Sequence, residues 1–250
     1  MYPKPSALHR IPYQLGESAG IIISDRETAV EEALSTMLFH RERLTEYVRL
    51  NPFFKEALDP IQLDDGPLVA RLMAEHSATA GVGPMAAVAG VLADLAIREM
   101  LVHGARVAVV ENGGEAAVVS DSPVDVALQA GDEPLSRRIG FRLEAFPVGV
   151  ATSSGRFSHA LSFGEAEAVT VFAGSAGLAD AAATAVGNTV KGPDEEEAAR
   201  RGVETGLSIM GVKGVFVLYR GTVGVGGRVP KIIGVDPVES NEASVSLRSV

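Results

Sequence analysis

Apolar residues in the first half of the chain recur at the spacing of a helix. Between residues 26 and 51 they recur at separations of three, four or seven positions, with charged residues between them. This pattern places one apolar stripe on a single helix face. The residues of the stripe are Val30, Leu34, Met37, Leu38, Leu44 and Val48.

Three further helices are predicted before residue 105. Two are short, over residues 52–58 and 66–81. The third runs over residues 81–104 as one long helix, with Pro84 in its first turn and Gly104 just past its end, which are the positions that these residues favour.

Short β-rich runs dominate the rest of the chain, after one early strand at 20–25. Residues 105–119 predict a hairpin that turns at Asn112-Gly113-Gly114, because paired residues of this type suit tight hairpin turns. Other strands are predicted within 141–155, 167–174, 214–227 and 230–236, and helices over 179–188 and 192–211.

The order of the elements predicts an α+β fold with a mainly antiparallel sheet flanked by helices. Helices come first, and strands and helices are then mixed, which is unlike a doubly wound sheet. The glycine-rich run 221–227 is not followed by a helical pattern, so it does not indicate a dinucleotide fingerprint. We expect residues 1–250 to form a single domain, with two closely packed lobes as the alternative.

Composition narrows the classes of function. The 250 residues are 46% hydrophobic and carry a net charge of −10, which disfavours nucleic acid as a partner. Cysteine is absent, which excludes disulfides, thiolate metal sites and a cysteine nucleophile. No apolar run approaches the roughly 20 residues of a membrane span, and the first residues lack a signal-peptide pattern. We expect a cytoplasmic protein that does not act at a membrane.

The alanine-rich segment 179–188 carries a carboxylate and a hydroxyl four residues apart, Asp180 and Thr184. On a helix they share one face, where they could converge on Mg²⁺, which takes oxygen ligands. The alternative is structural. Asp180 would then cap or charge the first turn of its own helix, and Thr184 would hydrogen-bond to a carbonyl of the preceding turn.

A second candidate site follows a predicted strand. Thr152, Ser153 and Ser154 precede Gly155, and hydroxyls with glycine amides can hold a phosphate. His159 follows closely and could act as a base near neutral pH. A serine-rich turn with a solvent-facing histidine is the alternative.

Two glycine-containing segments add backbone groups. The run from Glu111 to Glu115 is either a plain hairpin turn or a place where a planar ligand touches the paired glycines. Residues 81–90 offer either free amides for an anion at a helix start or a close helix contact.

Taken together and in this order, four blocks resemble the ApbE-like family, which includes FAD:protein FMN transferases. The family has a "GGIAKGYAVD"-like helix, an "NLGGD"-like turn, a "TSG" before an "HIIDPRTG"-like stretch, and an "ADALSTA" helix. Here the blocks read "AAVAGVLAD", "ENGGEA", "ATSSGRFSHALSFG" and "ADAAATA". They cover roughly residues 81–188, about two-fifths of the chain.

The resemblance implies a T-fold-like architecture with FAD in a central cleft. It assigns Mg²⁺ to Asp180 and Thr184 and the role of catalytic base to His159. It further implies that the flavin nucleotide contacts Gly90 and two other segments. These contain Asn112, Gly113, Gly114 and Glu115, and Thr152, Ser153, Ser154 and Gly155.

The chain departs from the family pattern at several positions. Ala89 replaces the lysine of "AKG", Glu115 replaces the aspartate of "GGD", and "DPRTG" is lost. Loss of the lysine removes a positive charge that would steady phosphates.

Three functions therefore stay open. The first is Mg²⁺-dependent flavinyl transfer to an acceptor protein, or FAD pyrophosphate cleavage. The second is binding of a flavin or another nucleotide without this chemistry, with a link to anaerobic sulfur metabolism as one setting. The third is a structural protein with a vestigial cleft. The helix at 26–51 lies outside the matched blocks and could cover the cleft or form a homodimer.

Overall fold

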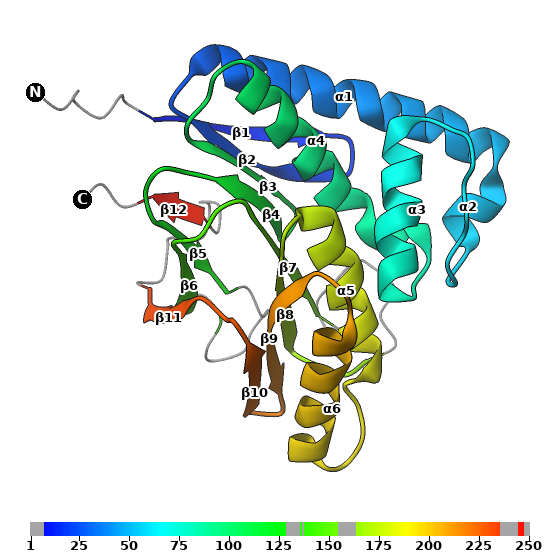
Figure 1. Cartoon of the computed structure of the whole chain (residues 1–250), viewed down its shortest axis with the longest axis vertical. Helices are drawn as coiled ribbons and strands as arrows, with labels where there is room; N and C mark the ends of the chain where they lie inside the picture. The colour runs from blue at the N-terminus through cyan, green and yellow to red at the C-terminus, as the bar shows by residue number, and fades with distance from the viewer. Residues whose placement is uncertain (1–7, 129–135, 137, 155–163, 236–244, 248–250) are drawn as a thin grey trace, which may run out of the picture.

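The chain folds into three layers, with helices over one face of a large sheet and a small sheet against the other face (Figure 1). A computed structural model describes residues 8–128, 136, 138–154, 164–235 and 245–247. Every pair of neighbouring strands in the described chain is antiparallel. The predicted α+β fold with an antiparallel sheet is confirmed.

The large sheet has eight strands in the order β1-β2-β3-β4-β7-β8-β9-β10. They are β1 (His9–Leu15), β2 (Ser18–Ser24), β3 (Ala108–Asn112), β4 (Glu115–Val119), β7 (Val148–Ser153), β8 (Ala168–Ala173), β9 (Val212–Tyr219) and β10 (Thr222–Gly227). The small sheet has the order β11-β6-β5-β12. Its strands are β5 (Val124–Ala127), β6 (Ile139–Leu143), β11 (Lys231–Gly234) and β12 (Val245–Leu247).

Central strands of the large sheet are apolar on both faces because both faces are covered. In β2, Ile22 packs into the core beneath the helices, whereas Ile21 and Ile23 pack into the core shared with the small sheet. Successive side chains of a strand point to opposite faces, so a continuous apolar run serves two cores at once.

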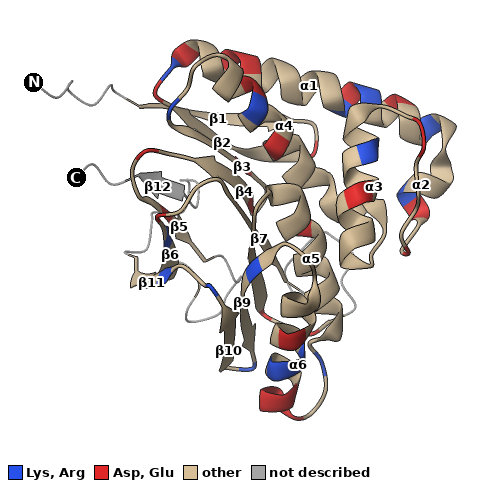
Figure 2. Cartoon of the chain, in the orientation of Figure 1, with Lys and Arg blue, Asp and Glu red and all other residues tan. Residues whose placement is uncertain are grey.

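The helices form the layer on the other side of the sheet. They are α1 (Glu27–Leu50), α2 (Pro52–Glu56), α3 (Leu68–Ala80), the 3₁₀ turn η1 (Pro84–Ala87), α4 (Val88–Val102), α5 (Ala176–Thr189) and α6 (Glu195–Ser208). Figure 2 shows charges of both signs along α1 and α6. No single helix of the described residues is long and apolar enough to cross a membrane, although α3 and η1–α4, bent by 101°, pass that test as a pair.

Two predicted elements are corrected. The single helix over 81–104 is interrupted, since η1 ends at Ala87 with φ −118° and ψ 5° before α4 begins. A Cβ on Gly83 would lie 1.9 Å from the carbonyl O of Ala57, so the chain passes tightly beneath α2 here and only then turns into α4. The run 141–155 divides into the end of β6 and the whole of β7, which belong to different sheets.

Candidate functional site

The site is built where α4 crosses α5. A Cβ on Gly90 would lie 2.2 Å from the carbonyl O of Ala176, so only glycine allows the two helices to approach this closely. Asp94, one turn further along α4, accepts the backbone N–H groups of Ala176 and Gly177 at 2.9 and 2.8 Å. Together these contacts fix the start of α5 against the first half of α4.

Asp180 is the fifth residue of α5 and reaches back to the start of α4. Its Oδ2 accepts the backbone N–H of Gly90 at 3.0 Å, and its side chain is partly buried. The carboxylate therefore lies at the positive end of the α4 dipole. Asp180 does not cap its own helix, because Ser175 does so by accepting the N–H of Leu178.

Thr184 lies one turn beyond Asp180 on the same helix and is also partly buried. Within the described residues its hydroxyl makes no hydrogen bond, whereas Thr189 of the same helix donates to the carbonyl O of Val186 at 2.7 Å. The predicted bond from Thr184 to a preceding carbonyl is not formed, so its hydroxyl oxygen stays available to a ligand.

The turn between β3 and β4 contacts the start of α4. The side-chain amide of Asn112 donates to the carbonyl O of Ala89 at 3.0 Å, which ties the turn to the first turn of α4. Gly113 and Gly114 have φ values of 74° and 120°, which glycine adopts without strain. The predicted hairpin is thus confirmed, and its turn lies beside Gly90.

Two acidic side chains flank this turn on opposite faces of the sheet. Glu115 pairs with Asn112 in the β3–β4 register, so its side chain shares the helix-facing side with that of Asn112. Glu111 lies on the other face, is buried, and accepts the N–H of Gly114 on Oε1 at 3.0 Å.

Burial raises the pKa of Glu111, Glu115 and Asp180, and a neighbouring negative charge adds to the shift at Glu115 and Asp180. Burial raises the pKa of Glu111 to about 7, against the hydrogen bonds that its carboxylate accepts from backbone amides. Burial, followed by the charges of Asp180 and Glu111, raises the pKa of Glu115 well above its usual range. Burial raises the pKa of Asp180 to about 7, although amides of Ala89 and Gly90 favour its charged form. Crowded carboxylates of this kind favour a bound cation.

The end of β7, which carries Thr152 and Ser153, lies next to the turn. The side chains of these two residues point to opposite faces of the large sheet. Ala151 pairs with Glu115, so Ser153 shares the helix-facing side with Glu115, and Thr152 points to the opposite side. The hydroxyl of Thr152 instead lies 2.9 Å from that of Thr170. Ser154 is buried. Gly155 and His159 lie outside the described residues.

The structure thus brings Gly90, Asp180 and the turn residues Asn112 to Glu115 together, with Thr184 on the adjoining turn of α5. Two contributors, Asp94 and Glu111, lie in the segments that the sequence singled out but were assigned no role in the site. Asp94 follows Gly90 by four residues and so shares its helix face. Glu111 is the only charged residue of β3, AVVEN, whose other residues are apolar apart from Asn112. A buried charged residue in such a strand often indicates a functional site.

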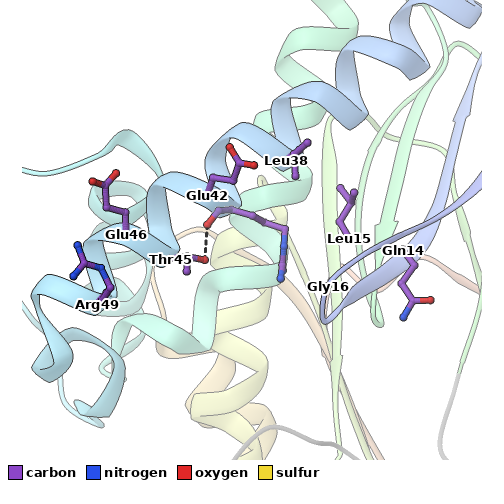
Figure 3. A pocket seen from close by; sticks show the side chains of 9 residues that line it. Gln14, Leu15, Gly16, Leu38, Glu42, Thr45, Glu46 and Arg49 are labelled. Carbon is purple, nitrogen blue, oxygen red and sulfur yellow. Dashed lines mark hydrogen bonds between the residues drawn. The ribbon is translucent and has the colours of Figure 1, made fainter.

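A hollow of about 520 Å³ lies apart from these residues, between α1 and the β1–β2 turn (Figure 3). Arg41, which lines the hollow, donates to the hydroxyl of Ser18 at 2.6 Å. None of the described residues predicted for the site lines this hollow. Its walls are Gln14, Leu15, Gly16, Leu38, Arg41, Glu42, Thr45, Glu46 and Arg49.

Known proteins match this chain in sequence and in fold. The family described as AbpE bacteria matches residues 5–207. A UPF0280 protein of Methanothermobacter thermautotrophicus is 40% identical over 202 residues, 80% of this chain and 79% of the relative. Another, from Methanopyrus kandleri, is 42% identical over 218 residues, 86% of this chain and 88% of the relative.

Solved structures of flavin transferases share the fold at low sequence identity. The apo flavinyl transferase ApbE of Pseudomonas stutzeri has a TM-score of 0.59 at 16% identity, covering 91% of this chain and 96% of its own. The ApbE protein of Thermotoga maritima has a TM-score of 0.59 at 13% identity, covering 88% and 97%. The fold and the match over residues 5–207 agree, and the chain belongs to the AbpE bacteria family, within the ApbE-like superfamily.

Proposed function

We propose that this protein binds FAD together with Mg²⁺ and transfers the flavinyl phosphate to an acceptor hydroxyl or to water. The observation that carries the proposal is the placement of Asp180. Its carboxylate is held at the start of α4 beside Glu115, and the unbonded hydroxyl of Thr184 lies on the next turn. The flavin transferase fold of the solved structures supports a flavin-related transferase.

The donor set suits Mg²⁺. The amide of Gly90 donates to Oδ2 of Asp180, and the proposed ligands of the ion are this carboxylate and the hydroxyl of Thr184. Mg²⁺ takes oxygen donors and needs few from the protein when phosphates supply the rest. When bound, the ion would neutralise the pyrophosphate and stabilise charge that develops on the leaving phosphate.

The transfer step needs a base and a place for the flavin half. The acceptor oxygen forms a bond to the phosphorus of the FMN half, the pyrophosphate P–O bond breaks, and AMP leaves. His159 is our proposed base for the hydroxyl proton. The backbone of Gly113 and Gly114 and the hydroxyl of Ser153 are proposed contacts of the nucleotide, with Ser154 and Gly155 adjoining them.

Binding without turnover is the second candidate, and one observation favours it. Ala89 stands where the family motif has lysine, and the groups that shift the pKa of Asp180 and Glu115 are carboxylates and backbone amides. An anionic ligand would then depend on the divalent ion for its affinity, without a basic side chain to position the leaving phosphate.

Partners and location are part of the same proposal. An acceptor protein with a Ser or Thr hydroxyl suits flavinyl transfer, and α1 offers a surface for a homodimer. The mixed charges of Figure 2 support a protein that binds neither nucleic acid nor membranes. We place it in the cytoplasm, as one domain.

The test is incubation of the purified protein with FAD and Mg²⁺, with and without a Ser/Thr acceptor peptide. Transfer is read as AMP by chromatography and as flavinylated peptide by mass spectrometry. EDTA and Asp180→Asn should abolish both products, while Asp59→Asn, at an exposed aspartate, should leave them unchanged. FAD binding without AMP supports the second candidate, and no FAD binding at all rejects both.

A further inference from the structure

We infer that Glu32, Glu99 and His103 form a second cation site, for a divalent transition metal of the zinc type. One ligand atom from each side chain lies within 4.8 Å of the other two. The three residues come from two helices, since Glu32 lies on α1 while Glu99 and His103 lie at the end of α4.

The α4 pair is preorganised by its spacing. Glu99 and His103 are four residues apart, and His103 Nδ1 lies 3.4 Å from Glu99 Oε1. The same Nδ1 lies 3.1 Å from the main-chain carbonyl O of Glu99. In the tautomer whose Nδ1–H donates to that carbonyl, Nε2 keeps a free lone pair, which is how metal-binding histidines are commonly oriented.

Within the described chain, neither glutamate of the cluster is paired with a lysine or an arginine. Arg26, which reaches this end of α4, donates to the carbonyl O of Gly104 at 2.6 Å. The carbonyl end of a helix also carries negative potential, which favours cations. Two carboxylates in this field are stabilised by a divalent ion.

The ligand types select the metal. Imidazole with carboxylate oxygens suits Zn²⁺, which completes a tetrahedron with water when three protein ligands are present. Mg²⁺ prefers oxygen ligands alone. The site is separate from Asp180, because Glu99 follows Gly90 by nine positions, which correspond to about 14 Å along α4. A bound ion would therefore join α1 to the helix that carries the candidate functional site.

The experiment is calorimetric titration of the intact protein with Zn²⁺ in excess Mg²⁺, which occupies oxygen-only sites. We expect one Zn²⁺ per chain in the wild type and in Asp180→Asn. His103→Gln and Glu32→Gln should each weaken binding about tenfold or more. Glu31→Gln, at the neighbouring exposed glutamate of α1, is the matched control and should bind as the wild type does.

A second measurement separates loss of ligands from loss of fold. Zn²⁺ should raise the melting temperature of the wild type and of Glu31→Gln, and not that of His103→Gln. Circular dichroism checks that each variant is folded. Absence of Zn²⁺ binding in the wild type, or its loss in Asp180→Asn with retention in His103→Gln, overturns the inference.

Discussion

Asp94 and Asp180 each accept backbone N–H groups from the first turn of the helix that carries the other. Asp94 of α4 binds the amides of Ala176 and Gly177, and Asp180 of α5 binds the amide of Gly90. Free amides at a helix start need acceptors, and here two helices supply them to each other. These reciprocal hydrogen bonds hold the side chain of Asp180 against α4, while Ser175 caps the start of α5.

The two aspartates should contribute differently to stability in the absence of metal. Asp94→Ala removes the acceptor of two helix-start amides and should lower the free energy of unfolding by about 1–3 kcal/mol. Asp180→Ala should cost less, because the side chain of Asp180 accepts the amide of Gly90 whereas that of Asp94 accepts two amides, and the charge of Asp94 opposes that of Asp180. Urea denaturation in EDTA measures both. A larger loss for Asp180→Ala than for Asp94→Ala would contradict the reciprocal arrangement.

Gly90→Ala should separate α4 from α5. The new Cβ would meet the backbone carbonyl of Ala176, and backbone cannot yield as a flexible side chain does. We expect a loss of about 1–3 kcal/mol in the free energy of unfolding, with weaker Mn²⁺ binding because Asp180 moves with α5. Gly174→Ala is the control, since a Cβ there meets no atom within 4 Å. Equal stability of the two variants would show that the helices approach less closely.

Thr184 offers a test of the metal ligand that spares the fold. Thr184→Val removes an oxygen that bonds to nothing else in the described chain, so unfolding should change by no more than about 0.5 kcal/mol. Mn²⁺ affinity, followed by electron paramagnetic resonance, should fall about tenfold. Thr184→Ser restores the oxygen and should restore the affinity. Unchanged affinity in the valine variant would remove Thr184 from the ligands.

Glu111 should make the metal-free protein less stable as the pH rises. Its pKa is about 7 when folded, against an ordinary value of 4.5, so the folded state binds more protons between these values. Stability is then highest below about pH 4.5 and is lost as the pH rises through about 7. Glu111→Gln should therefore be more stable than the wild type near pH 8 by at most about 3 kcal/mol.

The measurement is urea denaturation of both proteins across this pH range, in EDTA. The difference between them should vanish near the lower end of the range. The variant should still lose some stability with rising pH, because burial also raises the pKa values of Glu115 and Asp180. If the free energy of unfolding of the wild type rose relative to that of the variant as the pH increases, the prediction would be contradicted.

Elements with a strong apolar period were predictable, and weakly patterned ones were not. The stripe from Val30 to Val48 predicted α1 within a residue or two of its ends. By contrast β1, HRIPYQL, was missed because it is an edge strand with mostly exposed side chains and a proline. Edge strands need little apolar surface and tolerate proline, so their sequences resemble loops.

The sequence grouped residues that the structure brings close together, but it did not predict how they contact one another. Order along the chain grouped Gly90, Asn112 and Asp180. It could not assign Asp180 to the amide of Gly90, since that contact depends on how two helices cross. It also could not separate Thr152 from Ser153, because strand register decides which hydroxyl faces the helices. Local pattern fixes which faces are apolar, whereas crossing and register are set by the whole packed chain.

The amide of Gly90 and the carboxylate of Asp180 are 90 positions apart in the chain. Contacts of such long range form late, since the intervening loop must close first. During synthesis the start of α4 and the hairpin turn leave the ribosome well before residue 180 does. The nascent protein therefore passes through a period without the carboxylate of Asp180, and the contact between α4 and α5 is completed only when α5 docks.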